Sequence, residues 1–230
     1  MTGSEETVSP ANKRLGNHAF MFVIFTVFLD MLAFGIVMPT MPNLIAELLH
    51  GPDVMAAASE EERQALIARA VVWGGYITVV YAVLNFLSQP ILGNLSDRFG
   101  RRPVLLVSMA TLAIDFLIMG FAHSIWLLFI GRCLTGISGA THSTANAYIA
   151  DTTEPEKRAQ AFGMIGAAFG LGFIFGPVIG GYLGEIDPRA PFFAAAGLGA
   201  RNFLYGFFVL PESLAKTDRP KLDWKRANAF

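Results

Sequence analysis

Cysteine and charge are both scarce in this sequence. Its 230 residues include one cysteine, Cys133, which excludes an intramolecular disulfide and a cysteine-rich metal site. Charged residues make up 15% of the chain, whereas a soluble domain has about 25%. The 17 Lys and Arg are balanced by 18 Asp and Glu, so no basic excess is present to bind nucleic acid. The sequence has no phosphate-binding loop, HExxH metal motif or supported Ser/His/Asp triad, and we therefore expect neither an enzyme nor a metal site.

Long apolar segments dominate the chain instead. Hydrophobic residues make up 53% of it, and the mean hydropathy is +0.49. Buried helices of a soluble all-α protein would carry Glu and Lys at helical spacing on one face, and these segments do not. The sequence therefore predicts an all-α membrane protein with a six-helix bundle over 19–211. The predicted spans, each long enough to cross roughly 30 Å of hydrocarbon, are 19–42, 71–95, 103–122, 124–150, 159–184 and 191–210.

The distribution of Lys and Arg predicts the orientation in the membrane. Residues 1–18 lack a cleavable signal peptide and are predicted to be a cytoplasmic tail. Segments on the side of the two termini carry twelve Lys and Arg, and segments on the other side carry three. The positive-inside rule then places both termini in the cytoplasm of a multi-pass protein of the inner (plasma) membrane, with 212–230 as the start of a cytoplasmic linker. In the outer loop, Ser59 and Glu62 predict the start of a helix.

Four charged residues lie within the predicted spans: Asp30, Asp115, Arg132 and Arg201. A charge at the bilayer centre costs at least ~2.5 kcal/mol, so each needs a partner or an aqueous cavity. In one interpretation the acids and bases pair across helices and specify packing. In the other, an acid near an aqueous path binds and releases a proton, and a nearby cation such as Arg132 sets its proton affinity.

Polar residues form two further patches. In the fourth span, Arg132, Gly136, Gly139, Ser143 and Asn146 recur every three or four residues and should share a helix face that lines a cavity or contacts a neighbour. A second patch lies before Pro90, where interhelical hydrogen bonding is an equal alternative to substrate contact. A lone His142 is more often a packing residue than a ligand. The candidate substrate-facing residues are Asn85, Gln89, His142, Ser143, Asn146, Arg201 and Asn202.

Glycines repeat at every fourth position of the fifth span, at 172, 176, 180 and 184. Small residues at this spacing let two helix backbones approach closely, and Pro177 removes one helical hydrogen bond.

Three motifs carry a resemblance to a known family. The segment 93–103, GNLSDRFGRRP, resembles the loop between the second and third helices of the major facilitator superfamily. Arg132 with Gly136, Gly139 and Ala140 is similar to a second motif of that family, and 172–181 to the motif of its antiporters. Within the family the chain resembles the tetracycline efflux branch of proton-coupled drug antiporters most. The residues that suggest this are 28–30, Met38 with Pro39, Asp115, 139–141, 147–151 and 210–213.

The resemblance implies the amino-terminal half of that fold, six helices in two nested three-helix repeats. It implies that Asp30 and Asp115 are essential for transport and that Arg132 tunes proton binding. It also implies a cytoplasmic charge cluster, or latch, and an antiporter motif. The latch residues would be Gly93, Asp97, Arg98, Gly100, Arg101, Arg102 and Asp151, and the antiporter motif would be Gly172, Gly176, Pro177, Gly180 and Gly181.

The implied function is proton-coupled efflux of a hydrophobic drug, with tetracycline first among substrates, alone or as a chelate with a divalent cation. The energy source would be the proton gradient, with no cofactor, and the partners would be the lipid bilayer and a missing carboxy-terminal half. Two alternatives stay open. The chain is a truncated fragment or a scaffold subunit without transport activity, or it belongs to a transporter of another small molecule, such as a sugar or an organic anion, for which Arg201 would suit an anionic group.

Overall fold

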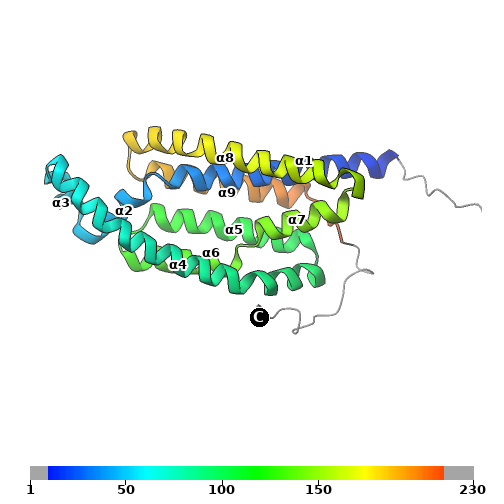
Figure 1. Ribbon diagram of the computed structural model, residues 1–230, viewed down its shortest axis with the longest axis horizontal. Coiled ribbons are helices and arrows are strands. Elements are labelled where there is room, and N and C mark those ends of the chain that lie inside the picture. Colours follow the sequence, from blue (N-terminus) through cyan, green and yellow to red (C-terminus); the bar gives the residue numbers. More distant parts are fainter. Residues whose placement is uncertain (1–9, 215–230) are drawn as a thin grey trace, which may run out of the picture.

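The computed structural model describes the backbone of residues 10–214 and the side chains of residues 20–214, and helices are the regular elements of this part of the chain (Figure 1). The all-α prediction is confirmed. Five helices, α1, α4, α5, α8 and α9, are long and apolar enough to cross a membrane. The helices are α1 Pro10–Val37, α2 Met41–His50, α3 Pro52–Ala57, α4 Glu60–Phe99, α5 Arg101–Gly120, α6 Ile125–Ser138, α7 Thr141–Thr152, α8 Arg158–Ile186 and α9 Ala190–Val209, with a 3₁₀ turn at Pro155–Lys157.

The fourth predicted span, 124–150, is not one helix. It is divided into α6 and α7, because Gly139 has φ −77° and ψ 83°, outside the helical region. The hydroxyl of Ser108 on α5 donates to the Ser138 carbonyl at 2.7 Å and accepts from the Ala140 N–H at 3.0 Å. A neighbouring helix thus satisfies the backbone groups that the break releases, as a break inside a membrane requires.

The polar stripe predicted along this span is divided as well. On α6, Arg132 and Gly136 are buried, whereas Asn146 on α7 is exposed. The prediction assumed one continuous helix, and the break gives α7 a different rotation about its axis. The stripe is therefore not a single face.

Other boundaries differ from the predicted ones at the ends of the helices. The first helix begins at Pro10 instead of 19, and it ends at Val37, after which a short turn leads into α2. The second spanning helix, α4, begins at Glu60 instead of 71. The predicted helix start is confirmed, since the Ser59 hydroxyl accepts from the Glu62 N–H and the Glu62 carboxylate accepts from the Ser59 N–H at 2.9 Å. Residues 1–9 of the predicted tail and 215–230 of the predicted linker lie outside the described residues.

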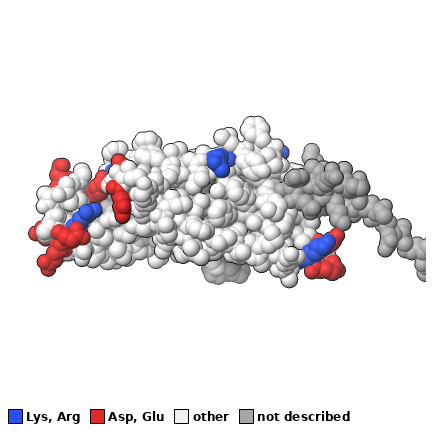
Figure 2. Space-filling model, turned by 90° about the horizontal axis from the view of Figure 1, so that it is seen from above, with Lys and Arg blue, Asp and Glu red and all other residues white. Residues whose placement is uncertain are grey.

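The helices are arranged around α1 and α5. In Figure 1, α1 lies with α8 and α9, and α5 lies with α6 and α4. Of the most apolar stretches of each helix, 61% of residues in α1 and 56% in α5 are buried, against 11% in α4 and 17% in α8, which are peripheral. The view in Figure 2 shows charged side chains at the two ends and a largely uncharged surface between them. This distribution fits a bundle embedded in lipid.

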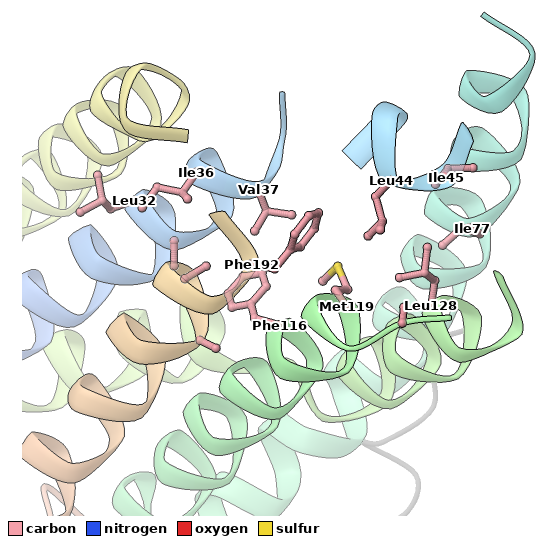
Figure 3. Close-up of a cluster of buried hydrophobic side chains, with 14 of the residues drawn as sticks. Leu32, Ile36, Val37, Leu44, Ile45, Ile77, Phe116, Met119, Leu128 and Phe192 are labelled. Carbon is pink, nitrogen blue, oxygen red and sulfur yellow. The ribbon is translucent and has the colours of Figure 1, made fainter. Parts of the chain in front are cut away.

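Two clusters of buried apolar side chains form the core. The first joins α1, α2, α4, α5, α6 and α9 and includes Phe116, Met119, Leu128 and Phe192 (Figure 3). The second, toward the end where α7 finishes, includes Met109 and Tyr148. Since lipid is as apolar as these side chains, association of the helices depends on close packing rather than on exclusion of water.

The tightest packing is between α1 and α8, along the predicted glycine row. A Cβ atom on Gly172 would lie 2.7 Å from the Phe28 carbonyl oxygen, and one on Gly176 would lie 2.6 Å from the Gly35 Cα. A Cβ on Gly180 would overlap the Ile36 carbonyl. Gly181, by contrast, has no atom within 4 Å of its would-be Cβ. The glycines of the row are therefore needed for the approach of the two backbones, and Gly181 is not.

We expect Gly180→Ala to separate α1 from α8, because the new methyl group would meet backbone rather than a movable side chain. Overpacking of this kind costs about 2 kcal/mol, which corresponds to a fall in Tm of about 5 °C in a domain of this size. Thermal unfolding of the purified protein in detergent measures this. Gly181→Ala is the matched control and should leave Tm unchanged; equal Tm values for both variants would contradict the packing role.

Candidate functional site

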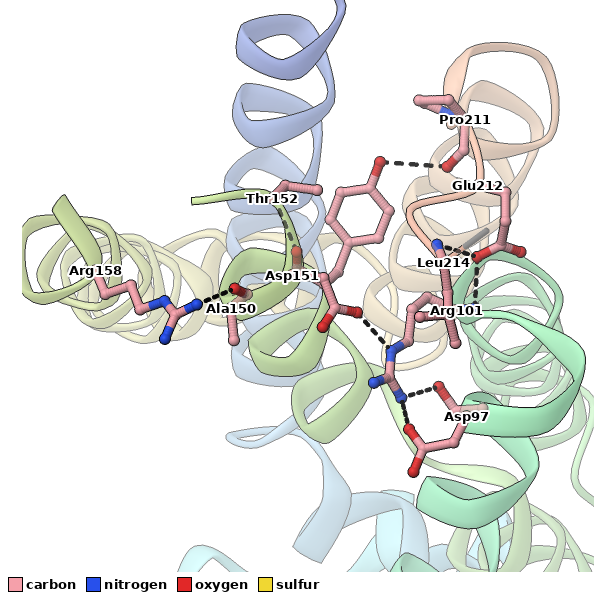
Figure 4. A network of polar contacts seen from close by, with 11 residues as sticks. Asp97, Arg101, Ala150, Asp151, Thr152, Arg158, Pro211, Glu212 and Leu214 are labelled. Carbon is pink, nitrogen blue, oxygen red and sulfur yellow. Dashed lines mark hydrogen bonds and ion pairs between the residues drawn. The ribbon is translucent and has the colours of Figure 1, made fainter. Parts of the chain in front are cut away.

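A charge cluster lies where α4, α5 and α7 meet (Figure 4). The Arg101 guanidinium forms ion pairs with Asp97 on α4 and with Asp151 on α7, the latter with Nε 3.0 Å from Oδ2. It also donates to the Ser96 hydroxyl at 3.1 Å. Gly100, with φ +108°, ends α4 and begins α5 in a conformation that favours glycine. The structure thus brings Asp97, Arg101 and Asp151 together, as the resemblance implied.

The other residues of the predicted latch take different positions. Arg102 donates to the Phe207 carbonyl of α9 at 2.6 Å, and the Arg98 guanidinium lies over the ring of Phe99, 5.5 Å from its centroid. Gly93 has open space around its would-be Cβ. Arg102 therefore joins α5 to α9, whereas Arg98 and Gly93 are not part of the ion-pair cluster.

Glu212 is a member of this region that was not predicted as a site residue. Its Oε1 accepts the backbone N–H of Arg101 at 2.7 Å, so a carboxylate caps the amino-terminal end of α5 (Figure 4). Nearby, the Tyr148 hydroxyl donates to the Pro211 carbonyl at 3.2 Å. The segment after α9 is thereby attached to α5 and α7. In the sequence, Glu212 belonged only to the segment 210–213 that contributed to the family resemblance.

We expect Asp151→Asn to weaken the cluster, because Arg101 then keeps only one acidic partner. A partly exposed pair contributes about 1 kcal/mol, so Tm should fall by roughly 2–4 °C. The control is Glu154→Gln, which neutralises the acid of the exposed Lys157–Glu154 pair and should change Tm little. If both substitutions lower Tm by the same amount, the Arg101 cluster contributes no more to stability than an exposed ion pair.

Inside the membrane-spanning part, Asp115 on α5 forms an ion pair with Arg132 on α6. Asp115 is fully buried and Arg132 is 7% exposed. The guanidinium also lies over the ring of Tyr81 on α4, 5.9 Å from its centroid. A Cβ on Gly131 would lie 2.5 Å from Asp115 Oδ1, so this glycine provides the room for the carboxylate. Gly131 belongs to none of the sequence motifs and was not predicted as a site residue.

We expect Arg132→Gln to destabilise the protein by about 3 kcal/mol, because it leaves the Asp115 carboxylate buried without a cation. The double variant Asp115→Asn/Arg132→Gln removes both charges and should recover most of that loss. Chemical or thermal unfolding of the two variants in detergent provides the comparison. A double variant as unstable as the single one would show that the pair does not act as a unit.

Asp30 on α1 has a different environment. It is 3% exposed and, among the described residues, has no cation within ion-pair distance. Its Oδ1 accepts from the side-chain amide of Asn202 on α9 at 3.1 Å. The Thr141 side chain at the start of α7 lies close to the same carboxyl group. Asn202, predicted to face substrate, is only 1% exposed and is instead a partner of Asp30.

Asn85 and Gln89 of α4 were also candidate substrate-facing residues, and the structure gives them a bundle-internal role. Both donate to the Gly139 carbonyl at 2.9 Å, and Gln89 also donates to the Asn85 side chain at 3.2 Å. They therefore hold the break between α6 and α7 through interhelical hydrogen bonds. Ser143 donates to the Ala140 carbonyl within its own helix at 3.2 Å.

The remaining polar candidates are on the surface of the bundle. His142 and Asn146 on α7 and Arg201 on α9 are all exposed. The His142 ring lies 5.8 Å from that of Phe169 on α8. Since such groups are costly in hydrocarbon, these positions require water or another protein surface beside them.

Arg189, between α8 and α9, organises the opposite end of the bundle. It pairs with Glu47 on α2 at 2.8 Å and donates to the carbonyls of Gly120 and Ala122 at 3.0 and 2.8 Å. It thus connects α2, the α5–α6 turn and the start of α9. In the sequence it counted only toward the orientation of the chain.

No group of three or more His, Cys, Asp or Glu that could hold a metal ion is present between residues 20 and 214. The polar features are a buried ion pair, a buried acid without a cation and a charge cluster at one end. On a bundle of apolar spanning helices, this combination is typical of the class of membrane transport proteins.

Comparison with known proteins specifies the family. The Major Facilitator Superfamily model matches residues 23–228, nearly the whole chain. The chain therefore belongs to the major facilitator superfamily, and it has the fold of the amino-terminal half of such a transporter. This family consists of transporters and not of enzymes.

Similar proteins include two curated drug-resistance proteins from Escherichia coli. The chain is 42% identical to the class C tetracycline resistance protein over 89% of its own length and 48% of that protein. It is 39% identical to the class B protein over 86% and 45%. Among solved structures, the human organic anion transporter MFSD10 (TETRAN) matches with a TM-score of 0.74 and 30% identity, over 89% of this chain and 50% of that one. The chain spans about half the length of the curated relatives it matches.

Proposed function

We propose that this chain is the amino-terminal half of a proton-coupled antiporter that exports hydrophobic drugs, with tetracycline as the first substrate to test. The observation that carries the proposal is the contrast between the two buried acids. Asp115 is neutralised by Arg132, whereas Asp30 has no cation partner among the described residues and is available to bind and release a proton. The tetracycline resistance relatives favour this exchange over other transport reactions.

The Arg101 cluster would serve as the latch of the transport cycle. Opposite charges at the ends of α4, α5 and α7 can separate and re-form when helices move as rigid bodies. Asp97 and Asp151 share one guanidinium, so a tilt of α7 would break the ion pair with Asp151 and leave the one with Asp97. The pair would favour one of the two orientations of the transporter.

A second six-helix half would complete the molecule. Alternating access in this kind of transporter uses two bundles that rock about a shared site near the middle of the membrane. The exposed polar residues His142, Asn146 and Arg201 require such a surface or the aqueous cavity beside it. We further propose that the protein lies in the inner (plasma) membrane with both termini in the cytoplasm, uses the proton gradient and needs no cofactor.

The test is uptake of fluorescent tetracycline into everted membrane vesicles. The chain is expressed alone and together with the carboxy-terminal half of the class C tetracycline resistance protein of E. coli. We expect accumulation that depends on the proton gradient only when both halves are present, and a loss of at least tenfold in Asp30→Asn. The matched control is Asp53→Asn, which makes the same change in the exposed helix α3.

Accumulation that survives Asp30→Asn would contradict the assignment of that acid. No accumulation by the paired halves, when both are inserted and associate, would contradict the tetracycline assignment and leave either another substrate or a chain without transport activity. In a scaffold, Asp30, Asp115 and Arg132 can be neutralised with little effect on partner binding.

An organic anion is a second candidate substrate, favoured by the exposed Arg201 on α9 and by the structural similarity to a protein described as an organic anion transporter. If the substrate is anionic, Arg201→Gln should abolish its transport in the same vesicles. If the substrate is tetracycline, the variant should retain most of the activity.

A further inference from the structure

We infer that Asn202, oriented by Thr26, is a positioning residue that selects Oδ2 of Asp30 as the atom that binds the proton. The three side chains are all buried: Thr26 and Asn202 are each 1% exposed and Asp30 is 3% exposed. Thr26 and Asp30 are one turn apart on α1, so both can face the same residue of α9.

The direction of the Asn202 amide follows from the carboxylate of Asp30, and Thr26 supports it. An ionised carboxylate can only accept hydrogen bonds, so the amide must turn its NH₂ group toward Asp30. Its oxygen then faces Thr26, whose hydroxyl donates to it at 3.3 Å. The acceptor-only carboxylate of Asp30 therefore fixes the orientation, because the reverse orientation would turn the amide oxygen toward it and lose that hydrogen bond. The Thr26 hydroxyl, which can donate or accept, donates to the amide oxygen and holds the side chain in this orientation.

This orientation makes the two oxygens of Asp30 unequal. Oδ1 accepts from Asn202 Nδ2 at 3.1 Å, whereas Oδ2 is buried and makes no hydrogen bond in the described part of the protein. The Thr141 side chain is the other polar group close to this carboxyl group. A proton placed on Oδ1 would face the amide NH₂, a donor, and would break that bond. A proton on Oδ2 leaves the bond intact, so Asn202 can hold Asp30 in both protonation states.

A hydrogen bond to the charged form also sets the proton affinity of the carboxyl group. Loss of the Asn202 donor removes a stabilisation of the carboxylate, and the group should then take up its proton at higher pH. Three helices, α7, α8 and α9, pack against α1. Their other charged or titratable side chains are His142, Tyr148 and Asp151 on α7, Arg158, Tyr182 and Glu185 on α8, and Arg201 and Tyr205 on α9.

The inference rests on the proposed function only in giving Asp30 a role in proton binding, and its test does not require transport. The infrared C=O stretching band of protonated Asp30 is followed against pH in the purified 230-residue chain, and the band is assigned by its absence in Asp30→Asn. We expect Asn202→Leu to move the midpoint upward by about one pH unit, tenfold in proton affinity. The band itself should move to higher frequency, because its carbonyl oxygen loses a hydrogen bond.

Thr26 provides a second variant that changes little in shape. Thr26→Val removes the hydroxyl and should move the midpoint in the same direction, whereas Thr26→Ser keeps the donor and should not. Thr111→Val is the matched control, because the Thr111 hydroxyl is bonded to the Val107 carbonyl of its own helix. A midpoint and band unchanged in both Asn202→Leu and Thr26→Val would overturn the inference. A change in Asn202→Leu alone would remove Thr26 from it, and loss of transport with a normal titration would count against the proposed function only.

Discussion

Polar groups in the membrane-spanning part of this chain depend on partners inside the bundle, because lipid offers them none. The break at Gly139 shows this most clearly, since three side chains from α4 and α5 occupy the backbone groups that it releases. Asp115 is held by Arg132, and Asp30 by Asn202. Each of these contacts joins two helices. The need of each buried polar group for a hydrogen-bond or ion-pair partner therefore also determines which helices are neighbours and at what height along the bundle they meet.

Close packing and polar contacts have separate places in the molecule. The α1–α8 interface is formed by glycines without a polar side chain, and α5 and α6 meet at an ion pair. At each end of the bundle, one arginine connects several elements. Arg101 joins α4, α5 and α7, and Arg189 joins α2, α9 and the turn before α6. Tight apolar packing suits surfaces that stay together, whereas ion pairs at the ends can be exchanged when helices move.

Composition was enough to predict the spanning helices, because a membrane requires long uncharged segments whatever their packing. The glycine row was predicted from its spacing, and the proximity of Asp97, Arg101 and Asp151 came only from the family resemblance. The break in the fourth span could not be predicted, since the side chains that satisfy its backbone groups, Asn85, Gln89 and Ser108, lie on other helices. The same holds for Asn202 and Gly131, whose environments are formed by residues far away in the sequence. From the sequence alone, a polar side chain in a span could either face substrate or bond to another helix, and only its neighbours in the structure decide between the two.

The division of the fourth pass has a geometric consequence. In an uninterrupted helix each residue adds about 100° of rotation, so the direction of every later side chain is fixed by the earlier ones. The two residues between α6 and α7 interrupt this dependence. Arg132 can point into the bundle toward Asp115 while His142 and Asn146 point out of it. One pass through the membrane thus presents two independently oriented faces, an inner one with a fixed charge and an outer one whose polar groups can change without disturbing that charge.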